Sequence, residues 1–171
     1  MPRYVAFLRG VSPMNAKMPE LKRTFEKAGF ENVKTVLASG NVVFDSTSKS
    51  DSALASKIEK AMQEHLDRTF MTIVRSTKAL RELIDSDPYS EYRLPAKSKH
   101  VVTFLRKAPT AKLSLPIKFS DARILAVRGQ EVLTSYVPHP GSPEFMRLIE
   151  KTFGTEITTR TLDTVKKCAA A

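Results

Sequence analysis

The chain has 171 residues, a formal net charge of +10 and a pI of about 9.8. Hydrophobic residues make up 42% and charged residues 27%, which is typical of a soluble globular protein, and the positive surplus favours anionic partners. Cys168 is the only cysteine, so an intrachain disulfide and a cysteine metal cluster are excluded. No apolar run reaches the length of a signal-peptide core or a membrane span, so we expect a cytoplasmic protein without membrane contact.

The first half of the chain predicts the order strand, helix, hairpin, helix, strand. Pro19 suits a first helical position, and Gly29 suits the end of that helix. Gly40 and Asn41 tolerate positive φ and separate two β-rich runs, as a hairpin turn does. The expected elements are a strand at 3–9, a helix at 19–28, hairpin strands at 33–37 and 42–44, a helix at 51–66 and a strand at 70–74. This βαββαβ order is that of the ferredoxin-like arrangement.

The second half repeats the same order after a connecting helix that starts near Ser76. We expect a first helix within 107–120 to be short or degenerate, because Pro109 and Pro116 interrupt it. The other expected elements are a strand at 100–105, hairpin strands at 124–127 and 132–136, a helix at 142–153, a strand at 156–158 and a terminal helix at 161–169. The predicted fold is therefore α+β, with tandem ferredoxin-like halves at 1–85 and 99–171, antiparallel hairpins, and a linker at 86–98. The halves share element order but no visible sequence similarity, so an internal duplication is left open.

Three segments carry a resemblance to a known family. They are Phe7-Leu8-Arg9-Gly10-Val11, Ser39-Gly40-Asn41-Val42-Val43-Phe44, and Thr158-Thr159-Arg160 with Thr164-Val165-Lys166. Together they resemble a mostly bacterial family known as domain of unknown function 1697, which implies two ferredoxin-like halves and no established activity. The chain departs from the family where Val11 runs into Ser-Pro-Met-Asn instead of glycines, and where Leu162 replaces a usual aromatic residue. A loop site that needed glycine for close backbone approach would be altered.

Loops beside predicted strands supply the candidates for binding an anion. A strand-to-helix turn follows Arg9, and a helix beginning near Thr161 would offer free backbone N–H groups beside a guanidinium. The candidate ligand-binding residues are Arg9, Asn15, Lys17, Ser39, Asn41, Thr158, Thr159, Arg160 and Thr161. Each has a structural alternative: an ordinary βα connection, plain turn chemistry, or a helix cap at Thr161 with Asp163 already satisfying the helix dipole. We expect Arg9, Asn41 and Arg160 to converge on one cleft.

The region 93–128 holds nine basic residues against one acid, Asp121. A phosphate-contacting nucleic-acid face and a merely solvated face both explain that excess. The candidates for the nucleic-acid face are Arg106, Lys107, Lys112 and Lys118. The three histidines are isolated in sequence, so we expect no metal and no cofactor, and no catalytic residue is identified.

We therefore expect a non-enzymatic binding module for an anionic ligand, either a phosphate-bearing small molecule or nucleic acid. One alternative is an enzyme acting on a phosphorylated or carboxylated metabolite, with Arg9 and Arg160 as clamps. The other alternative is a homo-oligomeric interaction module that associates through its sheets.

Overall fold

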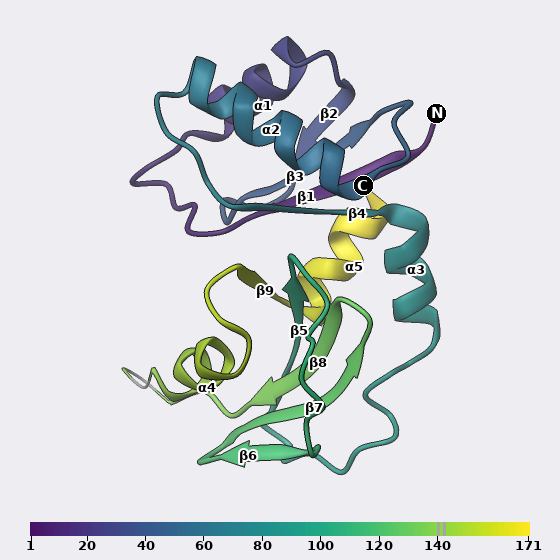
Figure 1. Cartoon of the computed structure of the whole chain (residues 1–171), viewed down its shortest axis with the longest axis vertical. Coiled ribbons are helices and arrows are strands. Elements are labelled where there is room, and N and C mark those ends of the chain that lie inside the picture. Colours follow the sequence, from purple (N-terminus) through teal and green to yellow (C-terminus); the bar gives the residue numbers. More distant parts are fainter. Residues whose placement is uncertain (140, 142) are drawn as a thin grey trace. The chain divides into compact units, whose positions relative to one another are not determined.

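The structure is a computed structural model that describes residues 1–139, 141 and 143–171. Over these residues the chain has a mixed α+β fold with two antiparallel sheets and five helices (Figure 1). It divides into two compact units. Unit 1 comprises Met1–Leu83 and Lys166–Ala171, and unit 2 comprises Ile84–Val165. None of the helices in the described residues has the length and apolar character needed to cross a bilayer.

Unit 1 has a four-stranded antiparallel sheet in the order β2-β3-β1-β4. Its strands are β1 (Arg3–Leu8), β2 (Glu31–Thr35), β3 (Asn41–Asp45) and β4 (Thr72–Ser76), and its helices are α1 (Met18–Lys27), α2 (Asp51–His65) and the start of α3 (Thr77–Asp85). Helix α1 connects β1 to β2, and α2 connects β3 to β4. The expected order of strand, helix, hairpin, helix and strand is thus present in this unit.

The core of unit 1 centres on Phe44. Its ring lies 5.9 Å from Tyr4, 5.6 Å from Phe25 and 4.5 Å from Phe30, measured between ring centroids. Alternate residues of β1 contribute to this cluster, and the residues between them are buried as well. Because both faces of β1 are buried, its sequence is a continuous apolar run with no polar alternation.

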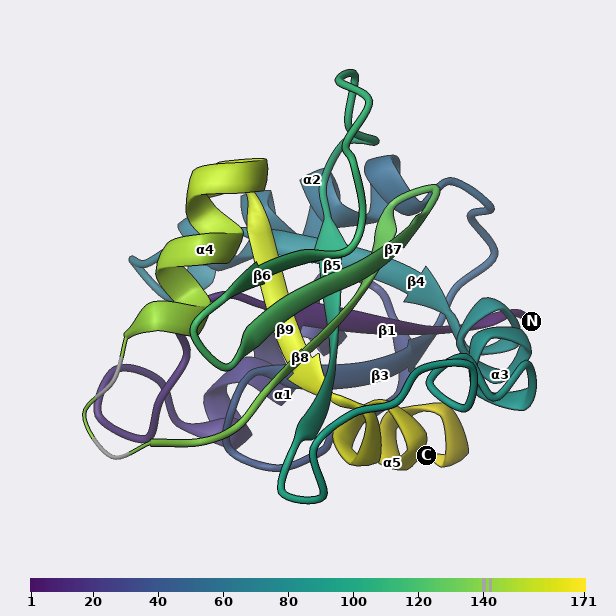
Figure 2. The same ribbon diagram turned by 90° about the horizontal axis from the view of Figure 1, so that it is seen from below.

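Unit 2 has a five-stranded antiparallel sheet in the order β6-β7-β8-β5-β9. Its strands are β5 (Lys99–Leu105), β6 (Ile117–Phe119), β7 (Ala122–Arg128), β8 (Glu131–Tyr136) and β9 (Ile157–Thr161). Helix α4 (Glu144–Phe153) covers one face of this sheet, where Phe145, Leu148 and Ile149 pack with Val101 and Ile124 (Figures 1 and 2). Helix α5 (Leu162–Ala170) follows β9 directly.

The connection between β5 and β7 differs from the expectation. No helix, short or degenerate, occurs in residues 107–120. Residues 106–116 are irregular, and β6 then adds an edge strand to the sheet. Pro109 and Pro116 lack the amide hydrogens that a helix needs, and short apolar runs pair readily at a free sheet edge. The last strand is also longer than the expected 156–158, so Thr158–Thr161 are strand residues.

The segment 86–98 is a loop, as its composition predicts, but it is packed onto the sheet of unit 2. The Tyr89 side chain is only 4% exposed. Its ring stacks on His100 with centroids 4.5 Å apart, and its hydroxyl donates to the Val101 carbonyl at 2.7 Å. At the other end of the chain, Lys166–Ala171 belong to unit 1, where Arg3 Nε donates to the Ala171 carbonyl at 3.0 Å. The term linker therefore describes the composition of 86–98 better than its packing.

Candidate functional site

The loop after β1 is organised by Asn15. Its side-chain oxygen accepts from the Ser12 amide at 2.8 Å, and its Nδ2 donates to the Gly10 carbonyl at 2.8 Å. These bonds hold the loop in place through its own groups, so Asn15 has a structural role. Lys17 is exposed at the N-cap position of α1, and the Arg9 amide donates to the Met71 carbonyl at 2.9 Å.

The turn between β2 and β3 is explained by its own hydrogen bonds. Asn41 is fully buried, and its Nδ2 donates to the Val36 carbonyl at 2.9 Å and to Ser39 Oγ at 3.0 Å. Gly40 has φ +86°, and a Cβ there would lie 2.9 Å from Val11 Cβ. These polar and glycine positions are therefore needed by the hairpin itself.

Several side chains of Thr158–Thr161 form local hydrogen bonds. Arg160 Nη1 donates to Thr158 Oγ1 at 2.6 Å and to the Thr159 carbonyl at 2.8 Å. Thr161 Oγ1 accepts from the Thr164 amide at 3.3 Å, which makes Thr161 a cap of α5. Asp163 lies in the first turn of that helix. These contacts match the structural alternative given for Thr161.

The proposed convergence of three residues falls across the two units. Arg9 and Asn41 belong to unit 1, and Arg160 belongs to unit 2. Their meeting in one cleft stays a prediction. What the structure adds is that the Asn41 amide and one Arg160 nitrogen already bond within their own units.

Strand register places the basic residues of unit 2 along a track. Lys118 pairs with Arg123, Arg123 with Ser135, and Ser135 with His100, so Lys118 lies level with the start of β5. Arg106 follows the other end of β5, about 20 Å away at roughly 3.3 Å per residue. The connection 106–116 runs between these two ends.

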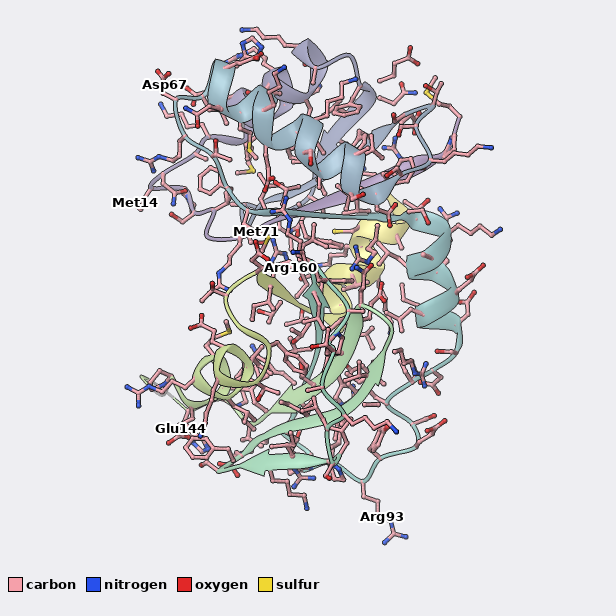
Figure 3. All side chains as sticks on the ribbon, in the orientation of Figure 1. Met14, Asp67, Met71, Arg93, Glu144 and Arg160 are labelled. Carbon is pink, nitrogen blue, oxygen red and sulfur yellow. The ribbon has the colours of Figure 1, made fainter. Side chains whose placement is uncertain are left out.

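Three lysines on this track are available to a ligand. Lys107, Lys112 and Lys118 are exposed, and within the described part of the chain none of them forms an ion pair. Arg106 differs because it is only partly exposed and already interacts with other groups. In the segment 86–98 of unit 2, Arg93 extends into solvent (Figure 3). The nucleic-acid candidates thus form an extended set and not one compact cluster.

Lys107 also lines a pocket of 340 Å³ between the start of this connection and the end of α4. The walls are mostly apolar, with Thr110, Thr152 and Glu156 as their other polar side chains. The carboxylate of Glu156 offsets the lysine charge in this pocket. The lysine track, and not this pocket alone, is therefore the stronger anion candidate.

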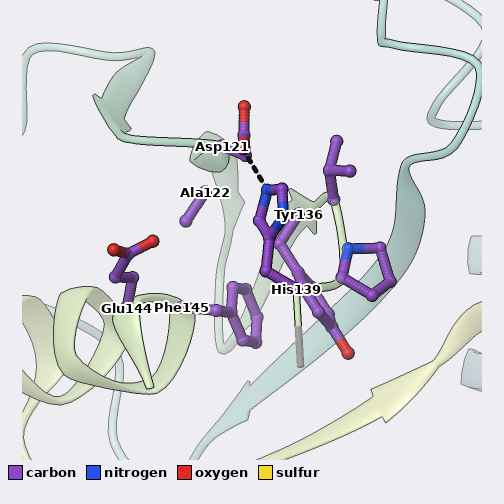
Figure 4. A pocket seen from close by; sticks show the side chains of 8 residues that line it. Asp121, Ala122, Tyr136, His139, Glu144 and Phe145 are labelled. Carbon is purple, nitrogen blue, oxygen red and sulfur yellow. Dashed lines mark hydrogen bonds and ion pairs between the residues drawn. The ribbon is translucent and has the colours of Figure 1, made fainter. Parts of the chain in front are cut away.

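A second pocket, of 200 Å³, lies beside the β7–β8 hairpin and holds residues that the sequence analysis did not select. Its lining residues are Asp121, Ala122, Tyr136, Val137, Pro138, His139, Glu144 and Phe145 (Figure 4). His139 Nε2 is hydrogen-bonded to Asp121 Oδ2. Antiparallel pairing of Ala122 with Tyr136, followed by a bond from the Val137 amide to the Asp121 carbonyl at 3.3 Å, brings the two side chains together.

This pocket is lined by hydrogen-bond acceptors and by two aromatic rings. Tyr136 and Phe145 stack with centroids 4.5 Å apart and an interplanar angle of 23°. An ionised carboxylate only accepts, so a neutral His139 donates its Nε2 hydrogen to Asp121 and keeps Nδ1 as an acceptor. Glu144, the first residue of α4, adds a second carboxylate. The described residues contain no group of three or more His, Cys, Asp or Glu side chains that could hold a metal ion.

Sequence reasoning missed the His139–Asp121 pair because the two residues are 18 positions apart. Neither belongs to a motif, and their approach depends on the register of the hairpin. The sequence did contain one signal, the two β-rich runs on either side of Gly129-Gln130. Aligning these runs as an antiparallel hairpin could have placed Asp121 near His139.

Comparison with known proteins supports the family resemblance and the fold. The family described as "Protein of unknown function (DUF1697)" matches residues 1–132. A solved structure, that of the conserved bacterial protein SP0830 from Streptococcus pneumoniae, is similar with a TM-score of 0.71 and 19% sequence identity. The similarity covers 99% of this chain and 97% of that one. At this identity the likeness concerns the fold alone. No curated protein matches the chain.

Proposed function

We propose that this chain, which belongs to the DUF1697 family, is a non-enzymatic module that binds nucleic acid through unit 2. The observation that carries the proposal is the lysine track formed by Lys107, Lys112 and Lys118. All three are exposed, and within the described residues none forms an ion pair with an acid. Such lysines can replace the counterions condensed on a phosphate backbone, and the release of those ions drives binding.

The length of the track favours a polymer over a small phosphorylated molecule. The ends of β5, which the track connects, are about 20 Å apart. One strand of a duplex carries a phosphate every 3.4 Å or so, so about six phosphates span this distance. A ligand with a single phosphate can contact only one end. We therefore favour nucleic acid over the small-molecule ligand that the sequence leaves open.

We also propose that both units are variants of the ferredoxin-like arrangement. If β5, β7, β8 and β9 of unit 2 are matched in chain order to β1, β2, β3 and β4 of unit 1, the sheet order β7-β8-β5-β9 is the same as β2-β3-β1-β4. Helix α4 stands where α2 stands, and the connection with β6 stands where α1 would be. In unit 2 the lysine track therefore stands at the point of the chain order where unit 1 has a helix.

The test measures the salt dependence of binding. A variant with Lys107, Lys112 and Lys118 replaced by Gln is compared with the wild type by fluorescence anisotropy, using labelled 20-nucleotide single strands and duplexes. For three phosphate contacts the slope of log K against log [salt] should become shallower by about 2 for single strands and nearly 3 for duplexes. Inorganic phosphate and a mononucleotide serve as small competitors, and neither should displace the strand at concentrations that leave the ionic strength unchanged.

The matched control removes the same charge elsewhere. Lys22, Lys27 and Lys60 are exposed on helices α1 and α2 of unit 1, and their replacement by Gln also lowers the net charge by three. This variant should keep the wild-type slope to within about one contact. Equal losses in the two variants, or no wild-type binding at low salt, would show that the track is only a solvated face.

A further inference from the structure

We propose that the pocket beside the β7–β8 hairpin binds a small planar group that presents N–H donors, such as an amidine or an amino-substituted heterocycle. This inference does not rest on nucleic-acid binding by the lysine track. It rests on the acceptors and rings that line the pocket, namely Asp121, His139 and Glu144 with Tyr136 and Phe145.

The polar lining is complementary to donors and not to anions. Asp121 and Glu144 carry negative charge at neutral pH and can only accept hydrogen bonds. When His139 is neutral, its Nε2 hydrogen is donated to Asp121, and Nδ1 is then a third acceptor. The chain as a whole has a net charge of +10, which makes this pocket an acidic exception on a basic protein. A phosphate would be repelled here by two carboxylates.

The apolar lining is complementary to a flat group. The stacked rings of Tyr136 and Phe145 form one side of the pocket beside Ala122 (Figure 4). Aromatic faces attract planar rings by offset stacking and attract cations through the ring quadrupole. The volume of 200 Å³ is below the 300–1,000 Å³ or so of pockets that hold drug-sized ligands, which suits a single ring.

Other roles for the pair are less well supported. The side chains of His139 and Asp121 are 51% and 47% exposed, so the pair is open to water and lacks the dry surroundings of a buried catalytic dyad. A metal site would need more ligands than the described residues bring together. Recognition of a donor-bearing planar group uses all three acceptors and both rings.

The experiment is a titration followed by amide chemical shifts of the 15N-labelled full chain. The probes are benzamidine as a cationic donor, 2-aminopyrimidine as a neutral donor, and benzoate as a ring of similar size with the opposite charge. We expect saturable shifts at the amides of Ala122, Val137 and Phe145 with benzamidine and none with benzoate. Binding of 2-aminopyrimidine as well would show that donors suffice, and binding of benzamidine alone would show that the ligand must be a cation.

Substitutions test whether the carboxylates are responsible. Asp121→Asn and Glu144→Gln should each weaken benzamidine about tenfold, the effect of losing one charged hydrogen-bond acceptor. Glu91→Gln, an exposed acid of unit 2 outside the pocket, should leave the affinity unchanged. The proposal is overturned if benzoate binds equally well, if Glu91→Gln weakens binding as much, or if no probe gives saturable shifts at millimolar concentration.

Discussion

Replacement of Gly40 by alanine should destabilise unit 1 much more than the same replacement at Gly10. The two glycines have nearly the same backbone conformation, with φ of +86° and +85°. They differ in the space beside them. A Cβ at Gly40 would lie 2.9 Å from Val11 Cβ and 3.0 Å from the Leu8 carbonyl oxygen, whereas at Gly10 nothing lies within 4 Å.

The magnitudes follow from these two terms. A left-handed conformation costs a non-glycine residue about 1–2 kcal/mol, and this cost is the same in both variants. The lower entropy of the unfolded alanine chain returns about 0.4–1 kcal/mol in both variants, so this term cancels in the comparison. Only Gly40→Ala must also displace Val11 and the β1 backbone, and such overpacking typically costs about 1–3 kcal/mol. The difference between the two variants should therefore be about 1–3 kcal/mol.

The assay is thermal unfolding followed by circular dichroism, with hydrogen exchange as a local readout. For a chain of this size a difference of 1 kcal/mol corresponds to a shift in Tm of about 2–4 °C. The Leu8 amide donates to the Gly40 carbonyl at 2.9 Å, so its exchange should accelerate in Gly40→Ala and stay slow in Gly10→Ala. Equal destabilisation by the two substitutions would refute the steric argument and leave only the conformational term.

Two further predictions concern pH. Burial raises the pKa of Asp45, but hydrogen bonds from Asn32 and Arg3 outweigh this effect and hold the pKa below the ordinary value of 3.8. The ionised Asp45 carboxylate therefore stabilises the folded chain above about pH 4, and this stabilisation is lost as the pH falls through the pKa of Asp45 in the folded chain. Asp45→Asn should lower Tm at pH 6 and should flatten the dependence of Tm on pH below 4; an unchanged acid profile would contradict this. Burial raises the pKa of Tyr89 well above 10, outweighing the lowering effect of a backbone hydrogen bond, so stability should fall as pH rises beyond 10. Tyr89→Phe should lower the free energy of unfolding by about 0.5–1.5 kcal/mol at neutral pH, because the bond to the Val101 carbonyl is gone, and should lose less stability at alkaline pH. Absorbance at 295 nm follows the ionisation of the phenol, and unfolding at alkaline pH measures the stability. A stability profile identical to the wild type would argue against a buried phenol.

Local patterns in the sequence were sufficient for the order of the elements in unit 1, although the second and fourth strands lie at 31–35 and 72–76 and not at 33–37 and 70–74. Pro19 lies in the first turn of α1, and Gly40 ends the turn that precedes Asn41, the first residue of β3. Each of these signals acts over a few residues, through φ, through a missing amide hydrogen or through helical periodicity. The family resemblance likewise came from short segments and is confirmed by the match over residues 1–132.

Residue type indicated that several candidate residues would form hydrogen bonds, but it did not show with which groups. For Asn41 and Thr161 the sequence offered a structural role beside ligand binding, and their hydrogen bonds are those of the structural role. The sequence could not show that Arg160 bonds to Thr158 and Thr159, because β9 was expected to end before it. An error of a few residues at the end of one strand changed the surroundings of the whole segment.

The remaining features depend on which strands are neighbours, and tertiary structure alone decided them. The strand β6 replaces an expected helix because the free edge of β7 offers hydrogen bonds that two prolines deny to a helix. The register of β7 on β8 brings Asp121 to His139, and the pairing of the same sheet places Lys118 and Lys107 near opposite ends of β5. Composition and spacing describe what each segment can form by itself. Pairing between residues many positions apart is fixed only when the whole core of unit 2 is packed, since the free energy that selects one register comes from burying both strands at once.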